Sequence, residues 1–270
     1  MALPWLPARG GPDRPEVRSS RMSGRPGSAR YGIDGGFIAP SFYAALAGFL
    51  VGARLSARRR GHPGLGRLAA AGVVAVACSE ASFLYSTGPG KRSVWSELLD
   101  ALDLKGDEQV LDIGCGRGAV LIAAARRAPK GRAVGVDIWR RRDQSGNSRS
   151  ATEHNALVEG VAGRVELVDG DARELSFPPG SFDVVVSSLA FNNIRGAGER
   201  ARALHEAARV LRPGGRLRIV DDKAAGYAAP LRQAGCVDVT AGKLDWRTWF
   251  GLPGHHLELV VATKGTEQLS

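Results

Sequence analysis

Residues 110–118, which read VLDIGCGRG, decide the fold of this chain. A short apolar run ends in an acid, three glycines follow at alternate positions, and a helical pattern then covers residues 119–128. That order is typical of a strand, a tight turn and a helix. Glycine lets the backbone of such a turn take positive φ and approach a ligand without a Cβ in the way. The free N–H groups of the following helix point to the same place.

Two acids further along the chain extend this pattern. Asp137 ends the apolar run 133–136, and Asp171 follows the run 165–168. A carboxylate at the end of the second strand suits a ribose, because it can accept protons from both hydroxyls. A glycine-rich turn alone is weak, since tight turns use glycine for purely steric reasons. Together with the two acids, it favours a nucleoside-like ligand.

At these residues the chain resembles a known family. Asp-Ile-Gly-Cys-Gly-Arg-Gly, residues 112–118, is similar to the first motif of class I S-adenosylmethionine-dependent methyltransferases. The Leu-Arg-Pro-Gly-Gly turn of residues 211–215 resembles another hallmark of that superfamily. The resemblance covers residues 91–264. The glycine spacing differs from G-x-G-x-x-G, so a nicotinamide enzyme is the weaker interpretation.

The resemblance implies S-adenosylmethionine as the cofactor, lying across the first three strands. The glycine backbone would meet its methionine part, Asp112 its amino group and Asp137 its ribose. Ile138 and Trp139 would flank the adenine, whose amino group would donate to Asp171. The implied cofactor-binding residues are Asp112, Gly114, Cys115, Gly116, Gly118, Asp137, Ile138, Asp171, Ala172 and Ser188.

The end of the fourth expected strand gives no catalytic acid or base. Many relatives with small-molecule acceptors carry histidines around this position, whereas this chain has Asn192 and Asn193. Asparagine can orient a substrate but cannot act as a base at neutral pH. Asn192 is therefore a candidate for orienting the acceptor, and the alternative is that both amides cap a turn.

The alternation of strand and helix patterns predicts an α/β fold with a Rossmann-like, doubly wound, seven-stranded sheet. The last two strands follow each other without a strong helix, which predicts a closing C-terminal antiparallel hairpin. The expected strands are 109–112, 133–137, 165–169, 182–188, 216–220, 237–241 and 257–263. The expected helices are 91–104, 119–128, 151–159, 199–211 and 227–234.

Two apolar stretches precede this domain. Residues 35–53 contain no charge and are long enough to cross a hydrocarbon core of about 30 Å, and the second stretch, residues 68–90, carries one acid, Glu80. We expect a disordered basic tail over 1–34, a hydrophobic helical hairpin over 35–90 as a membrane anchor, and the methyltransferase domain over 91–270. The alternative is that both stretches are amphipathic or core helices that pack on the domain.

Charge and cysteine usage point to partners and compartment. The formal net charge is +10, and much of the basic excess lies in the first ninety residues. A basic tail beside apolar runs suggests an anionic membrane surface, and without a basic stripe with interleaved aromatics nucleic acid is an unlikely partner. The three cysteines form no Cys-x-x-Cys pair and give no metal site. We expect a cell-membrane protein with a cytoplasmic catalytic domain.

The sequence thus predicts methyl transfer from S-adenosylmethionine to a small-molecule or lipid-like acceptor at the membrane. The alternative is a catalytically degenerate protein of the same fold that serves as a membrane scaffold. The identity of the acceptor and the oligomeric state stay open. The C-terminal loop is rich in aromatic and histidine side chains that could meet the membrane interface, wall an acceptor pocket or pack in the hairpin: Trp246, Trp249, Phe250, His255 and His256.

Overall fold

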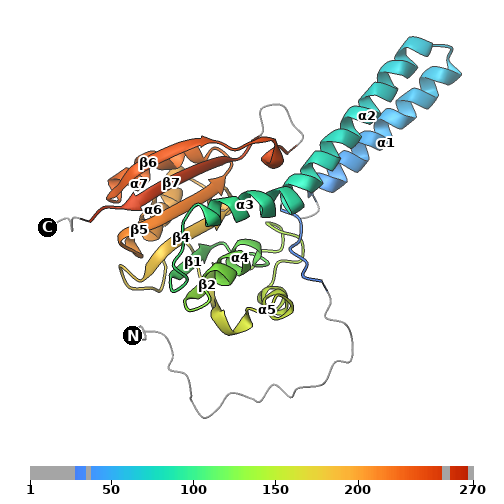
Figure 1. The fold of residues 1–270 in the computed structure, drawn as a ribbon. Coiled ribbons are helices and arrows are strands. Elements are labelled where there is room, and N and C mark those ends of the chain that lie inside the picture. Colours follow the sequence, from blue (N-terminus) through green and yellow to red (C-terminus); the bar gives the residue numbers. More distant parts are fainter. Residues whose placement is uncertain (1–27, 35–37, 251–255, 267–270) are drawn as a thin grey trace, which may run out of the picture.

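The computed structural model describes residues 28–34, 38–250 and 256–266. A seven-stranded sheet forms its centre, with the strand order β3-β2-β1-β4-β5-β7-β6 (Figure 1). The first five strands are parallel, and β7 runs antiparallel between β5 and β6. The predicted doubly wound sheet with its closing hairpin is therefore confirmed. The strands are β1 Gln109–Ile113, β2 Arg132–Asp137, β3 Val165–Asp169, β4 Phe182–Ser188, β5 Leu211–Asp221, β6 Cys236–Lys243 and β7 Glu258–Lys264.

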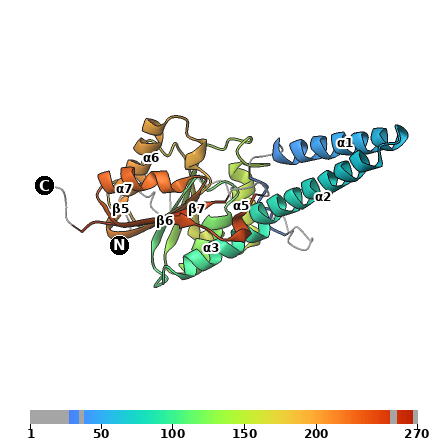
Figure 2. The same ribbon diagram turned by 90° about the horizontal axis from the view of Figure 1, so that it is seen from above.

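Helices cover both faces of the sheet because its central strands are apolar on both sides. Along β1, Val110 shares a core cluster with residues of α3 and α4, whereas Leu111 and Ile113 share another with residues of α6 and α7. Figure 2 shows α3 on one face of the sheet and α6 and α7 on the other. This alternation follows from the two-residue period of a strand. The helices of the domain are α3 Lys91–Asp100, α4 Ala119–Arg127, α5 Arg149–Val158, α6 Ala197–Arg209 and α7 Ala228–Gln233.

The strand order reverses beside β1, which sets the place of a ligand. The chain moves from β1 outward to β2 and β3, and then returns to β4 on the other side of β1. Crossovers that leave in opposite directions open a crevice beyond the carboxyl ends of β1 and β4. The residues that follow those strand ends therefore face a common space.

The two N-terminal helices form an antiparallel pair that projects away from the domain (Figures 1 and 2). We call α1, Ile38–Arg59, and α2, Pro63–Tyr85, the hairpin. The expected domain boundary at residue 90 does not separate two bodies. Helix α2 continues through a π-helical segment, Ser86–Gly90, into α3, so that one helix runs from Pro63 to Asp100. The hairpin is thus a direct extension of a domain helix.

The C-terminal loop packs on the root of the hairpin. The Trp249 carbonyl accepts hydrogen bonds from the hydroxyls of Ser82 and Ser86, at 2.9 and 2.7 Å. The Trp246 ring stacks on Tyr85 with 5.4 Å between ring centroids. These contacts are with the N-terminal helices and not within the C-terminal antiparallel hairpin, and Trp246 stays 67% exposed. His255 lies outside the described residues.

The expectation of a disordered tail up to residue 34 is wrong for residues 28–34, which we call the strap. Its backbone at Arg30 exchanges two hydrogen bonds with the Asn155 side chain, and Tyr31 donates to Glu159 on α5. Ile33 pairs with Ser145 through both its N–H and its carbonyl group. The strap therefore docks on α5 and on the loop after β2. The rest of the predicted tail, residues 1–27, lies outside the described residues.

Candidate active site

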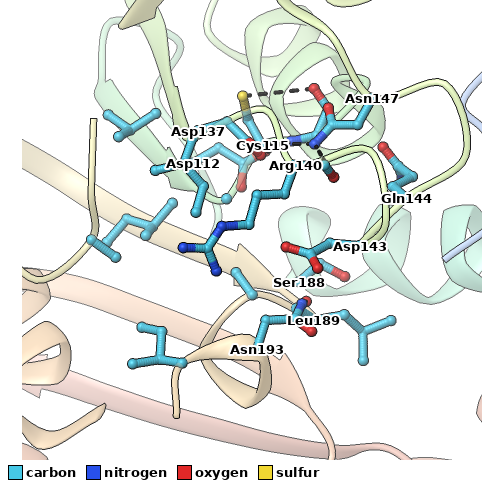
Figure 3. Close-up of a pocket in the computed structure, with 18 of the residues that line it drawn as sticks. Asp112, Cys115, Asp137, Arg140, Asp143, Gln144, Asn147, Ser188, Leu189 and Asn193 are labelled. Atoms are coloured by element: carbon cyan, nitrogen blue, oxygen red, sulfur yellow. Dashed lines mark hydrogen bonds between the residues drawn. The ribbon is translucent and has the colours of Figure 1, made fainter. Parts of the chain in front are cut away.

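A cavity of about 330 Å³ lies beyond the carboxyl ends of β1, β2 and β4. Figure 3 shows Asp112, Cys115 and Asp137 together on one side, Ser188 and Asn193 on another, and the Arg140 side chain reaching in between. Nine of the ten predicted cofactor residues line it: Asp112, Gly114, Cys115, Gly116, Asp137, Ile138, Asp171, Ala172 and Ser188. The tenth, Gly118, is not among the lining residues and forms the N-cap of α4 at φ +84°.

The turn after β1 requires glycine at the two positions that face the cavity. Gly114 and Gly116 have φ values of +72° and +51°, which side chains rarely adopt. A Cβ on Gly114 would lie 2.3 Å from the Ala190 Cβ, and one on Gly116 would lie 2.5 Å from the Gln144 Oε1. Bare backbone therefore forms this wall of the cavity.

Asp137 ends β2 and is held in a fixed orientation. Its Oδ2 accepts the Gly116 N–H at 2.8 Å, and its Oδ1 accepts the Trp139 N–H at 2.6 Å and the Asn147 amide at 3.3 Å. Ionised carboxylate oxygens have about four lone-pair sites between them, so acceptor capacity is left for a ligand. Asp137 is thus a preorganised acceptor of hydroxyl groups.

The Asp112 carboxylate faces the same cavity, and one of its oxygens lacks a hydrogen-bond donor among the described residues. Its side chain is buried, and its Oδ2 has no hydrogen-bond partner within the described residues. Burial raises the pKa of this carboxyl to about 7, and the nearby Lys91 charge opposes that rise. A buried carboxylate oxygen left without a donor is costly. The arrangement therefore fits a cationic donor that arrives with a ligand.

Asp171 lies at the far end of the cavity and is paired with Arg173. The guanidinium contacts both carboxylate oxygens, at 3.0 and 2.6 Å, and it also reaches Glu199 at 2.8 Å. This hydrogen-bonded guanidinium lowers the pKa of Asp171 and keeps it ionised. Ile138 and Ala172 line the cavity on this side, so an apolar surface for a flat ring adjoins the acid.

The acceptor side differs from the prediction by one residue. Asn193, not Asn192, lines the cavity, and its side-chain amide donates to the Leu189 carbonyl at 3.0 Å. Asn192 instead uses its backbone N–H, which donates to the buried Asp221 at 3.0 Å. The structure thus favours a turn-forming role for Asn192. The side chain placed to meet an acceptor belongs to Asn193.

The comparisons with known proteins agree with this geometry. Residues 111–219 match the family described as "Methyltransferase domain". Nocamycin O-methyltransferase of Saccharothrix syringae is 39% identical over 130 residues, which are 47% of this chain and 42% of that protein. The ubiquinone/menaquinone biosynthesis C-methyltransferase UbiE of Dinoroseobacter shibae is 33% identical over 133 residues, which are 49% of this chain and 50% of that protein.

The match over residues 111–219 and these two relatives support an S-adenosylmethionine-dependent methyltransferase domain in this part of the chain. The matches span half or less of the length of those two relatives. The solved structure of a geranyl diphosphate methyltransferase in complex with S-adenosylmethionine has a TM-score of 0.52 at 17% identity, and covers 64% of this chain and 85% of that one. This last likeness concerns the fold alone.

Asp34, Lys91 and Gln144 are among the residues that line the cavity without having been predicted, and they contact one another. The Lys91 ammonium bonds both oxygens of Asp34, at 3.1 and 3.0 Å, and the Gln144 amide donates to Asp34 at 3.1 Å. Lys91 and Asp34 lie 57 positions apart in the sequence, so no local pattern connects them. A polar loop directly after the second strand was the one available signal for Gln144.

Two further side chains of the methyltransferase domain have packing roles. Cys115 is buried, and burial raises the pKa of its thiol well above the ordinary value, which makes it a poor nucleophile. The indole N–H of Trp95, on α3, donates to the Ser188 hydroxyl at 3.0 Å, and both groups are buried. Ser188 is thus fixed at the end of β4 by the same helix that continues into the hairpin.

Proposed function

We propose that this chain transfers a methyl group from S-adenosylmethionine to a small, lipid-like acceptor at a membrane surface. The observation that carries the methyl-transfer part is the cavity itself. Bare glycine backbone, a preorganised carboxylate at Asp137 and an unpartnered carboxylate oxygen at Asp112 meet there. These are the groups that a sulfonium nucleoside with an amino-acid tail requires.

The described residues fit the cofactor at each of its parts. Asp112 would receive the ammonium group, Asp137 the ribose hydroxyls, and Asp171 with Ile138 and Ala172 the adenine. The bound cofactor supplies an activated methyl group on a positively charged sulfur. The protein then has to hold the acceptor atom in line with that methyl group, and alignment alone can supply much of the rate.

The lining residues favour an acceptor that needs little help in losing a proton. Among the described lining residues there is no histidine, and the amide of Asn193 cannot accept a proton at neutral pH. The acids closest to the turn after β1, Asp112 and Asp137, are directed to the cofactor. An electron-rich carbon or an already acidic hydroxyl would react under these conditions. Positioning is then the main contribution of the protein.

The membrane part of the proposal comes from the surface of the hairpin. Within the described residues, the continuous helix Pro63–Asp100 holds a stretch long and apolar enough to cross a membrane, of which 17% is buried. Large apolar side chains project from both hairpin helices, whereas monomeric soluble proteins rarely expose such contiguous patches. They are Phe42, Phe49, Val51, Leu55, Leu65, Leu68, Val74 and Leu84.

The proposed orientation places the methyltransferase domain in the cytoplasm of a cell-membrane protein. More basic residues flank the hairpin than lie at its tip, which weakly favours both ends inside. The flanking residues are Arg9, Arg14, Arg18, Arg21, Arg25, Arg30, Lys91 and Arg92, and the tip residues are Arg54, Arg58, Arg59, Arg60 and Arg67. The tip arginines would then meet the headgroups of the opposite leaflet.

The methyl-transfer proposal is tested by incubating the full chain with methyl-labelled S-adenosylmethionine and membrane extracts. Label should enter an extractable small molecule, and an Asp137→Ala variant should serve as the blank. Transfer that persists undiminished in Asp137→Ala would contradict the assigned cofactor site. Wild-type protein that binds no cofactor would instead support a scaffold with a degenerate site.

The membrane proposal is tested by flotation of the full chain with anionic vesicles. Wild-type protein should float and should stay bound in 1 M salt (a condition that screens charges beyond about 3 Å). A variant with Phe49→Asp and Val74→Asp should float far less, because a charge inside a bilayer is costly. Both positions are exposed on the protein, so the fold tolerates the change. Release of the wild type by salt alone would refute an inserted hairpin.

A further inference from the structure

The two segments that flank the hairpin, the strap before α1 and helix α3 after α2, meet at the rim of the cavity through a buried ion pair. Lys91, the first residue of α3, bonds both carboxylate oxygens of Asp34, the last residue of the strap, and their side chains are 10% and 13% exposed. Both residues line the cavity. A surface salt bridge would need no explanation, but this one is removed from water and faces the space that a ligand would fill.

The surroundings of Lys91 contain two carboxyl groups. Lys91 is the cation that acts most strongly on the buried Asp112, so one ammonium stands between two carboxylates. The Oδ2 of Asp112 has no hydrogen-bond partner among the described residues. The Lys91 ammonium has three donors and uses two of them on Asp34, and the ionised form of Asp112 can accept from a cation. This end of the cavity can therefore receive a group that carries both an ammonium and a carboxylate.

The other cations that line the cavity are Arg140, Arg142, Arg173 and Arg195, and none of them is among the charges that act on Asp112. Arg173 is paired with Asp171 and Glu199, and Arg142 lies 3.5 Å from Asp143. Arg140 acts electrostatically on Asp171, at the end assigned to the adenine. Lys91 is therefore the described cation with the strongest effect on Asp112.

We propose, resting on the proposed function, that Lys91 binds the α-carboxylate of S-adenosylmethionine while Asp112 binds its ammonium group. Asp34 is then a positioning residue that holds the Lys91 ammonium at the rim. Gln144 completes the arrangement, because its amide donates to Asp34 while its carbonyl accepts the Arg117 N–H beside the glycine turn. The strap thereby becomes a wall of the cofactor site.

The geometry of the helix junction explains how Lys91 reaches this place. Gly90 precedes it at the end of the π-helical segment, and a Cβ there would lie 2.3 Å from the Arg247 carbonyl oxygen. The close approach fixes the junction against the C-terminal loop. Trp95, one turn further along, is fixed to Ser188. Lys91 is thus held between two anchored points of the same helix.

The test is a calorimetric titration of the full chain with three probes that differ in the amino-acid tail. S-adenosylhomocysteine has both ionic groups, decarboxylated S-adenosylmethionine has the ammonium without the carboxylate, and methylthioadenosine has neither. Each probe is compared only between variant and wild type, because decarboxylated S-adenosylmethionine also carries a sulfonium charge. A Lys91→Met variant should bind S-adenosylhomocysteine about 10- to 100-fold more weakly, as expected for loss of a hydrogen bond between charged groups. It should bind methylthioadenosine within about twofold of the wild type, since that probe reports on the rest of the site.

Decarboxylated S-adenosylmethionine separates the two ionic contacts. Lys91→Met should not weaken it, whereas Asp112→Asn should. Asp34→Asn should weaken S-adenosylhomocysteine less than Lys91→Met does, and Asp34→Glu should restore part of the loss. Lys130→Met is the matched control, because Lys130 is exposed and does not line the cavity, and it should leave all three affinities unchanged.

Three outcomes would overturn the assignment of Lys91. An equal loss of all three probes in Lys91→Met would mean that the residue only supports the fold. Unchanged S-adenosylhomocysteine binding would mean that the carboxylate lies elsewhere, for example on the N–H groups at the start of α4. A loss for decarboxylated S-adenosylmethionine as large as that for S-adenosylhomocysteine would exclude a carboxylate contact. A wild-type chain that binds none of the probes would instead refute the proposed function.

Discussion

The two halves of the continuous helix Pro63–Asp100 have similar apolar side chains and opposite surroundings. In the first half, Leu68 and Val74 are 70% and 62% exposed. In the second half, Trp95 and Leu99 are 2% and 1% exposed, packed against α4 and the sheet. An apolar run in the sequence predicts that its side chains are buried, but it does not tell whether protein or lipid covers them. For the second half it is protein, and for the first half we propose a bilayer.

The largest expected effect distinguishes the two halves by their contribution to stability. Leu99→Ala should lower the free energy of unfolding by about 2–5 kcal/mol, because it removes buried side-chain volume and leaves a cavity. Leu68→Ala should change it by less than about 0.5 kcal/mol, as exposed substitutions usually do. Urea unfolding of both variants in one mild detergent measures the difference. A loss for Leu68→Ala that equals that for Leu99→Ala would mean that protein covers the outer face of the hairpin.

A smaller effect is expected on the pH dependence of ligand binding in the cavity beside α3, the second half of this helix. The pKa of Asp112 is raised to about 7 by burial, and the cofactor ammonium needs its ionised form. Lowering the pH from 8 to 6 should therefore weaken S-adenosylhomocysteine binding by about tenfold, since about one carboxyl in ten is ionised one unit below its pKa. Calorimetry at the two values measures this. The dependence should disappear in Asp112→Asn, and a profile that is the same in both proteins would contradict the role of Asp112.

The same titration affects the stability of the ligand-free protein with the opposite sign. Asp112 and Asp221 both have a pKa raised by burial to about 7, above the value near 3.9 of an unfolded chain. The folded state therefore binds these protons more tightly than the unfolded state does. Their joint contribution to stability falls as the pH rises from about 4 to about 7. Cofactor binding should offset the part that belongs to Asp112.

The sheet and most of the cofactor residues could be predicted from local sequence. An apolar run that ends in an acid, followed by alternating glycines, places Asp112, Gly114 and Gly116 at one strand end whatever the rest of the chain does. Asp137 and Asp171 follow by the same rule on neighbouring strands. The period-2 and period-3.6 patterns of a buried parallel sheet are strong signals, because both faces must be apolar. The roles of these residues toward a cofactor stay predictions.

The strap and the position of the asparagine side chains could not be predicted from the sequence. The strap depends on contacts between residues far apart in the chain, and the asparagines depend on the exact start of a short turn. The strap looks disordered in composition, yet it docks through its backbone on Asn155 and Ser145, contacts that no local pattern reveals. Asn193 faces the cavity in place of the predicted Asn192. Both lie in one 3₁₀ turn, in which a shift by one residue changes which side chain points to the cavity, and the sequence does not fix that shift. The domain boundary expected at residue 90 does not end a helix, because a π-helical segment accommodates Gly88 and Pro89 and carries the helix through.

The most direct test of a cofactor site across β1, β2 and β3 is a titration of S-adenosylhomocysteine into the full chain and into Asp137→Ala. We predict saturable binding at one site per chain in the wild type. Loss of two hydroxyl hydrogen bonds to a charged acceptor should weaken binding in the variant by at least about 100-fold, while vesicle flotation is unchanged. Equal affinities in the two proteins would contradict the account.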